Sequence, residues 1–205
     1  MDWIKQNIIV LNVLVISTRK SDNSNTEILA DEFIRGAIAG GHKIEKISLK
    51  NKKINFCNGC EVCQKTEKCI FQDDATEIIN KLHDSDVVVF AAPVYFGGAS
   101  GQMHTLLDRT YTLMQLKQNI KQTHKFKDVY LITASADEGE EFTDFVVNNI
   151  KEWIKSFDGT YRETQTKSRL AGVIRGLGVW DAGKIRNKPD KMKEAYELGK
   201  SISSK

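Results

Sequence analysis

Runs of apolar residues recur along the chain and predict the strands of a sheet. Two of them, 8–16 and 87–92, are almost unbroken and rich in β-branched side chains. Such runs are typical of strands buried on both faces, as in a parallel sheet. Residues 42–49 alternate between apolar and polar and predict another strand, and residues 127–133 predict a fourth. A fifth strand is expected within residues 160–180, a stretch interrupted by glycines.

Between these strands, apolar residues recur at the spacing of a helix that covers a core. The predicted helices are one that stops at Gly40-Gly41, one that begins at Asp73-Asp74, and three over residues 100–116, 140–157 and 188–202. Strand and helix alternate five times, which predicts a doubly wound α/β fold in a single domain, 1–205. Five parallel strands suit the order 2-1-3-4-5, and the ligand crevice then lies at the carboxyl ends of strands 1, 3 and 4.

Composition and charge narrow the range of partners. The chain of 205 residues is 40% hydrophobic and 28% charged, which is ordinary for a globular protein. A net charge of +3, spread over the whole sequence, does not indicate nucleic acid or a membrane surface as a partner. The chain shows neither an apolar run of membrane-spanning length nor the basic start of a signal peptide, so we expect a cytoplasmic protein.

All four cysteines lie within 13 positions, at the spacing C-x2-C-x2-C-x5-C. They are Cys57, Cys60, Cys63 and Cys69, in a cysteine-rich loop at residues 55–72. Disulfides are not expected in a reducing cytoplasm. Structural zinc sites usually draw their ligands from two separated pairs, whereas an iron–sulfur cluster accepts four thiolates from one looping segment. The spacing therefore favours a cluster; four free thiols retained from a cluster-binding ancestor, or a zinc ion, are the alternatives.

The loop after the first strand is dense in hydroxyl and amide groups and leads into a helix N-terminus. It contains no glycine, so neither a dinucleotide fingerprint nor a P-loop is present. The free N–H groups and the dipole at a helix N-terminus favour a phosphate. The polar groups concerned are Ser17, Thr18, Arg19, Ser24, Asn25 and Thr26. Alternatively, Ser24 to Glu27 form a capping box, which needs no ligand.

An aromatic pair, Tyr95-Phe96, follows the third strand and is expected to face the same crevice. Flat aromatic side chains beside a phosphate site suit a ring system that binds by stacking. The alternative is an ordinary turn with two core aromatics. Both interpretations fit the segment taken alone.

Four motifs in series resemble the iron–sulfur flavoprotein branch of the NAD(P)H-dependent FMN reductases, a family with a flavodoxin-like fold. They are the loop 17–26, the cysteine run with its trailing Asp73-Asp74, the segment Ala92–Gly97, and Leu106-Leu107-Asp108-Arg109. The later half of the chain matches mainly by its pattern of strands and helices. In this family the loop after the fourth strand is often glycine-rich; here it is Thr133 to Gly139, and no flavin contact is assigned to it.

The resemblance implies two cofactors and their binding residues. The FMN phosphate would be held by Ser17, Arg19, Ser24, Asn25 and Thr26, and the isoalloxazine would be lined by Pro93, Val94, Tyr95, Phe96 and Gly97. Cys57, Cys60, Cys63 and Cys69 would hold a [4Fe–4S] cluster. No catalytic side chain is predicted, because the flavin carries the chemistry. Asp108 and Arg109 are expected to form an ion pair at a helix end.

The sequence thus predicts an FMN-dependent oxidoreductase that passes electrons between a reduced donor and an acceptor. The donor is NAD(P)H or a small ferredoxin-like protein, and the acceptor is a small molecule or another redox protein. A homo-oligomer, dimer or tetramer, is expected, in which a neighbouring subunit approaches the cysteine loop. The alternatives are a cluster-free NAD(P)H-dependent reductase of FMN, quinones or nitro compounds, and a non-catalytic redox or metal sensor.

Overall fold

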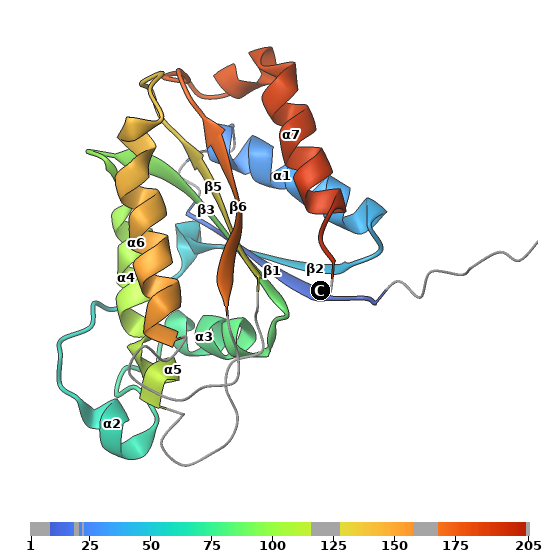
Figure 1. Ribbon diagram of the computed structural model, residues 1–205. Helices are drawn as coiled ribbons and strands as arrows, with labels where there is room; N and C mark the ends of the chain where they lie inside the picture. The colour runs from blue at the N-terminus through green and yellow to red at the C-terminus, as the bar shows by residue number, and fades with distance from the viewer. Residues whose placement is uncertain (1–8, 19–20, 22, 116–127, 158–167, 204–205) are drawn as a thin grey trace, which may run out of the picture.

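Five parallel strands form the centre of the protein (Figure 1). The computed structural model describes residues 9–18, 21, 23–115, 128–157 and 168–203. The strands lie side by side in the order β2 (Lys43–Ser48), β1 (Asn12–Ser17), β3 (Val87–Tyr95), β5 (Asp128–Ala134) and β6 (Arg169–Gly176). A short strand, β4 (Gly98–Ala99), folds back antiparallel onto the end of β3. Counting the parallel strands alone, the order is 2-1-3-4-5, so the predicted doubly wound fold is confirmed.

Helices cover both faces of the sheet (Figure 1). On one face lie α1 (Asn25–Ala39) and α7 (Pro189–Lys200); on the other lie α3 (Asp74–Asp84), α4 (Gly101–Arg109) and α6 (Glu141–Phe157). The shorter elements are α2 (Val62–Thr66), α5 (Tyr111–Gln115) and the 3-10 turns η1 (Leu49–Asn51) and η2 (Lys184–Asn187). Within the described residues, no helix combines the length and the apolar character needed to cross a membrane.

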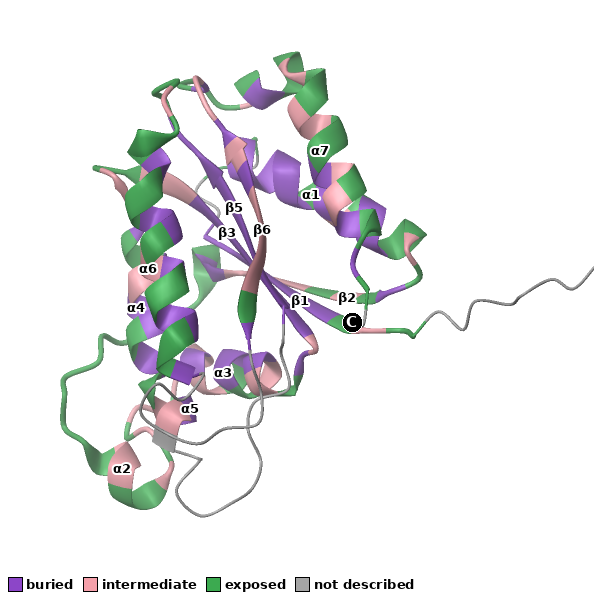
Figure 2. Ribbon diagram, in the orientation of Figure 1, coloured by how far each residue is buried: buried purple, intermediate pink, exposed green. Residues whose placement is uncertain are grey.

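The strands supply the core on both of their faces (Figure 2). Successive side chains of a strand point to opposite faces. In β1, Val13 and Val15 therefore pack with α1 and α7, whereas Leu14 and Ile16 pack with α3, α4 and α6. All four side chains are buried. The nearly unbroken apolar run in the sequence follows from this two-sided burial.

The predicted helix over residues 100–116 is interrupted at Thr110. The Thr110 hydroxyl donates to the Leu107 carbonyl oxygen at 2.6 Å and accepts from the Trp153 indole N–H at 2.8 Å. This buried bond to α6 holds Thr110 at the junction where α4 ends and α5 begins. The residue that binds Thr110 at this junction lies 43 positions away, so helical periodicity alone could not reveal the contact.

Two glycines let α1 and α7 approach each other closely. A Cβ atom on Gly36 would lie 1.9 Å from the Tyr196 carbonyl oxygen, and one on Gly199 would lie 2.0 Å from the Phe33 carbonyl oxygen. Both distances are far inside van der Waals contact, so the backbones meet where side chains are missing. This contact fixes α1, whose N-terminus lies at the carboxyl edge of the sheet.

Candidate functional site

A cavity of about 340 Å³ lies at the carboxyl edge of the sheet, where β1, β3 and β5 end. Its place is the point where the strand order reverses, which is where doubly wound folds bind ligands. Six of the predicted cofactor residues line it: Ser24, Asn25, Thr26, Pro93, Val94 and Tyr95. The loop before α1 and the end of β3, about 70 positions apart in sequence, therefore share one cavity. We call it the crevice cavity.

The N-terminus of α1 forms one wall of the crevice cavity. Ser24 occupies the N-cap position with extended backbone, yet its side chain makes no capping hydrogen bond. Its hydroxyl oxygen instead lies 3.0 Å from that of Thr26. The capping box expected as an alternative does not form, because the Glu27 carboxylate turns away towards Ser17 and Lys46. Ser24 thus leaves the first N–H groups of the helix for another acceptor.

Ser17 does not line the crevice cavity. It is buried at the end of β1, and its hydroxyl donates to the Glu27 carboxylate. The other oxygen of that carboxylate lies 2.5 Å from the Lys46 ammonium nitrogen. Ser17 therefore fixes the first turn of α1 against the sheet. Arg19, also predicted to bind the phosphate, lies outside the described residues.

Both polar atoms of the Asn25 side-chain amide form hydrogen bonds with the segment that makes the opposite wall of the cavity. Its Nδ2 donates to the carbonyl oxygens of Val179 at 3.0 Å and Asp181 at 2.9 Å, and its Oδ1 accepts from the Ile185 N–H at 3.1 Å. These bonds hold the segment after β6 across the cavity. The sequence did not predict this wall. Gly178 and Gly183, which both adopt positive φ, lie at the two ends of the segment and were the available signal. The lining residues that were not among the predicted cofactor residues are Ser21, Ala134, Ala136, Val179, Trp180 and Ala182.

The aromatic turn points partly into solvent. Phe96 (φ 51°) and Gly97 (φ 79°) form the two-residue turn that joins Tyr95 to Gly98 in the β3–β4 hairpin. A positive φ is rare for a bulky residue such as Phe. Phe96 is fully exposed, whereas Tyr95 lines the crevice cavity with an exposed fraction of 41%. Neither ring is a core aromatic, so that alternative is wrong.

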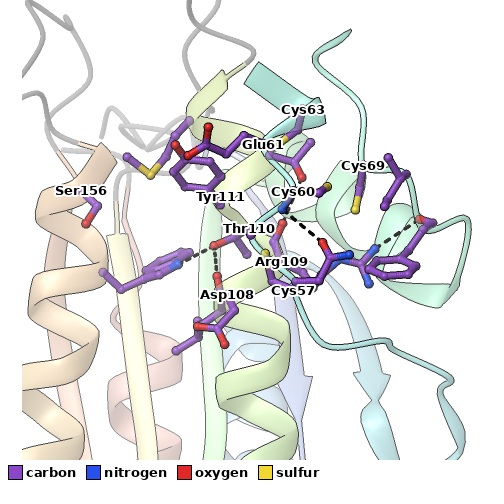
Figure 3. Close-up of a pocket in the computed structure, with 18 of the residues that line it drawn as sticks. Cys57, Cys60, Glu61, Cys63, Cys69, Asp108, Arg109, Thr110, Tyr111 and Ser156 are labelled. Atoms are coloured by element: carbon purple, nitrogen blue, oxygen red, sulfur yellow. Dashed lines mark hydrogen bonds between the residues drawn. The ribbon is translucent and has the colours of Figure 1, made fainter. Parts of the chain in front are cut away.

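A second cavity, of about 540 Å³, collects all four cysteines (Figure 3). We call it the cysteine cavity. Cys57 and Cys60 are exposed and Cys63 and Cys69 half-buried, and all four are free thiols. The rest of its lining comes from other residues of the cysteine loop, from the last turn of α4 with Thr110, from α5 and from the last turn of α6. The chain reverses repeatedly here, with positive φ at Gly59, Glu61 and Glu67.

The four thiols lie within electrostatic range of one another. Burial raises the pKa of the Cys63 thiol, and the charges of Cys69, Cys60 and Cys57 raise it further. Among the described residues, no three His, Cys, Asp or Glu side chains gather closely enough to hold a single metal ion. Four thiolates spread around one larger cavity are the donor set of an iron–sulfur cluster. The residues present therefore fit a cluster better than a zinc ion.

A buried ion pair closes the base of the cysteine loop. Arg109, at the end of α4, binds both carboxylate oxygens of Asp73, at 2.7 and 3.0 Å. Burial alone would raise the pKa of Asp73, but hydrogen bonds from Arg109 and Asn55 lower it to about 2. The expected pair of Asp108 with Arg109 is wrong: Asp108 is exposed, whereas Arg109 is buried and pairs with Asp73. Successive helical positions diverge by about 100°, so the two side chains do not meet.

The two cavities lie at opposite ends of α6. The crevice cavity includes Ala134 and Ala136, just before the helix, and the cysteine cavity includes Trp153, Ser156 and Phe157 at its end. A helix of 17 residues is about 25 Å long. Within one chain, the two candidate cofactor sites are therefore well separated.

Known proteins resemble this chain in sequence and in fold. The sequence profile of the NADPH-dependent FMN reductases matches residues 11–159. An iron–sulfur flavoprotein of Methanocaldococcus jannaschii is 32% identical over 68% of this chain and 70% of its own length. Another iron–sulfur flavoprotein, from Archaeoglobus fulgidus, is 28% identical over 67% of this chain, a match that spans 60% of that relative.

Solved structures agree on the architecture. The NAD(P)H:quinone oxidoreductase from Methanothermobacter marburgensis superimposes with a TM-score of 0.67, at 12% identity, over 94% of this chain and 99% of the other. Together with the sequence matches, this defines a flavin-dependent oxidoreductase with a flavodoxin-like fold. The chain belongs to the NADPH-dependent FMN reductase family, in its iron–sulfur flavoprotein branch. The resemblance seen in the sequence is confirmed.

Proposed function

We propose that the crevice cavity binds FMN, with its phosphate at the N-terminus of α1. A volume of about 340 Å³ lies within the range of small-molecule sites. The hydroxyls of Ser24 and Thr26, the helix amides and the Arg19 guanidinium would hold the phosphate. The flavin ring would lie against Pro93, Val94 and Tyr95, with Trp180 on the facing wall. Asn25 supports that wall, and Ser17 supports the helix start.

We further propose that Cys57, Cys60, Cys63 and Cys69 hold a [4Fe–4S] cluster in the cysteine cavity. The observation that carries this assignment is that all four thiols, at the spacing C-x2-C-x2-C-x5-C, line one cavity. Several relatives are named iron–sulfur flavoproteins, which supports the same assignment. A bound cluster would exchange single electrons, and FMN can exchange one or two.

The proposed function is electron transfer between a reduced donor, NAD(P)H or a ferredoxin-like protein, and an acceptor, through the two sites. Because the sites of one chain lie at opposite ends of α6, the shorter route would join the cysteine cavity of one subunit to the crevice cavity of another. This argument supports the homo-oligomer expected from the sequence. The protein's own residues bind and orient the cofactors and exclude water from them.

Anaerobic reconstitution tests the cluster. Wild-type protein is expected to take up about four iron and four sulfide ions per chain, and heat is expected to release FMN and not FAD. Cys60→Ser should abolish iron uptake and leave FMN bound, because the crevice cavity lies elsewhere. Val62→Ala, a change in α2 that removes no thiol, serves as the control and should keep its iron. Iron-free wild-type protein that still oxidises NAD(P)H would favour a cluster-free reductase.

A further inference from the structure

Arg109 ties the two flanks of the cysteine loop together. Its Nη1 donates to the Asn55 carbonyl oxygen at 2.9 Å, and its Nη2 donates to the Phe71 carbonyl oxygen at 3.2 Å. Asn55 precedes Cys57 by two positions and Phe71 follows Cys69 by two, so one guanidinium spans the whole cysteine run. We call Asn55, Phe71, Asp73 and Arg109 the loop neck.

The loop neck is the best-anchored part of this segment. Arg109 is only 1% exposed and the Asp73 side chain 7% exposed, and Asp73 also accepts from the Asn55 backbone N–H at 2.8 Å. Inside the loop, by contrast, α2 has no buried residue. Asp73 in addition caps α3 by accepting from the Ala75 N–H at 3.1 Å. The loop is therefore held at its base by buried hydrogen bonds, and further along it Gln64 in α2 donates to the Tyr111 hydroxyl of α5 at 3.0 Å.

One donor of Arg109 is left without a partner. Among the described residues, no group accepts a hydrogen bond from its buried Nε–H. Buried donors are almost always satisfied, so an unpaired one calls for an explanation. Arg109 lines the cysteine cavity, and the Cys69 thiol lies beside its guanidinium and interacts with it (Figure 3). A thiolate sulfur bound to iron would be a suitable acceptor at this place.

We propose that Arg109 is the positioning residue of the cluster site, which holds both ends of the cysteine loop and donates its Nε–H to the Cys69 thiolate. The proposal rests on the cluster assigned above. It gives the guanidinium two separable roles. The clamp on the loop does not need iron, whereas the contact of a positive charge with a cluster thiolate does.

The clamp is tested on FMN-loaded, iron-free protein by hydrogen exchange. In Arg109→Met, amides within residues 55–72 should exchange about tenfold faster or more than in wild type, because the neck has lost its hydrogen bonds. The matched control is Arg175→Met, which removes an arginine paired with Glu140 and Asp144 near the start of α6. It should leave exchange in residues 55–72 unchanged, and both variants should retain FMN.

The contact with the thiolate is tested on the reconstituted protein. Arg109→Met should lower the reduction potential of the cluster and speed its loss to a chelator, because a neighbouring positive charge favours the reduced, more negative form. Arg109→Lys keeps the charge and should restore much of the potential while its loop still exchanges faster. This variant also serves where Arg109→Met does not fold.

The two assignments can fail separately. Wild-type protein that takes up no iron after careful anaerobic work would overturn the proposed cluster. Wild-type protein that takes up iron, combined with unchanged exchange and an unchanged potential in the Arg109 variants, would overturn only the role of Arg109. Faster exchange with an unchanged potential would likewise overturn the contact with the Cys69 thiolate.

Discussion

Thr26 and Ser17 both carry hydroxyl groups near the start of α1, but they have different partners. Thr26 lines the crevice cavity, whereas the Ser17 hydroxyl is bound to Glu27. Thr26→Val should weaken FMN binding by about 1.5–3 kcal/mol, the range for a hydrogen bond to a charged group. That corresponds to an increase of about 10- to 150-fold in the dissociation constant. Titration of the flavin-free protein, followed by the quenching of flavin fluorescence, measures it.

Ser17→Ala is the control for this prediction. It removes a hydroxyl of similar size outside the crevice cavity and should change the FMN affinity less than Thr26→Val does. If both variants lose the same affinity, the hydroxyls act by shaping the loop and not by binding the phosphate.

Asp73 makes the stability of the protein depend on pH in acid. Its pKa is lowered to about 2 in the folded protein, against an ordinary value of about 3.9. A lowered carboxyl pKa stabilises the folded state above the unfolded-state pKa, and the stabilisation is lost as the pH falls from about 4 to about 2. The shift corresponds to about 2 kcal/mol at neutral pH.

Urea unfolding of wild type and Asp73→Asn checks this. The difference between their free energies of unfolding should be constant above about pH 5 and should shrink as the pH falls below about 4. The exposed neighbour serves as the control: Asp108→Asn should change stability at pH 7 by less than about 0.5 kcal/mol. A difference for Asp73→Asn that does not vary with pH would contradict the role of the charge.

The close backbone contact of α1 with α7 leaves no space for a side chain at Gly36. Gly36→Ala would place a Cβ atom 1.9 Å from the Tyr196 carbonyl oxygen, so the helices must separate. Overpacking of this kind costs about 1–3 kcal/mol, partly offset by the better helix propensity of alanine, about 1 kcal/mol. We expect a net loss of stability, measured by thermal or urea unfolding. Gly101→Ala, at a helical position with open space around it, should be neutral or stabilising.

The elements themselves were largely predictable, because each has a local signal. The run at residues 87–92 predicted β3, and Asp73-Asp74 predicted the start of α3, where the structure shows Asp73 as the N-cap. Features that depend on distant partners were not predictable. Thr110, where α4 ends, accepts a hydrogen bond from the Trp153 indole, and the cavity wall after β6 is bonded to the side chain of Asn25.

In the candidate sites too, the features with a local sequence pattern were predictable and those that depend on distant residues were not. The cysteine spacing, a local pattern, identified four thiols that do line one cavity. The loop neck was invisible, because Arg109 and Asp73 are 36 positions apart and the nearer Asp108 seemed the natural partner. Phe96 was assigned to the flavin by resemblance to the family; in this chain it lies in a turn at positive φ and its side chain is fully exposed. The spacing of apolar residues along the chain does not predict a positive φ at a single residue of a turn.

For the molecule as a whole, exposed aromatic side chains predict self-association. Phe96, Phe145 and Trp180 are 111%, 65% and 84% exposed and lie at or next to the rim of the crevice cavity: Trp180 lines it, Phe96 follows its lining residue Tyr95, and Phe145 lies close to Gly98. A second subunit that covers this rim would bury them. We expect light scattering to give a mass well above the 23.2 kDa of one chain. A monomer at working concentrations would contradict the prediction.

One substitution locates the interface. Burial of a phenylalanine contributes about 1.5–3 kcal/mol, so Phe96→Ser should raise the dissociation constant of the oligomer about tenfold or more. Ile38→Ser changes an apolar residue that is 59% exposed at the end of α1, away from the rim, and should leave assembly intact. Equal effects of both substitutions would place the interface elsewhere.

The loop neck has a consequence for how such a protein can change over evolutionary time. Because Asn55, Phe71 and Asp73 meet at a single guanidinium, the chain enters and leaves the cysteine segment at nearly the same point. The segment is thus a closed loop between β2 and α3, and a short linker across the neck could replace it without moving a strand. Metal dependence would then be a detachable trait, gained or lost by a lineage while the underlying flavin scaffold persists.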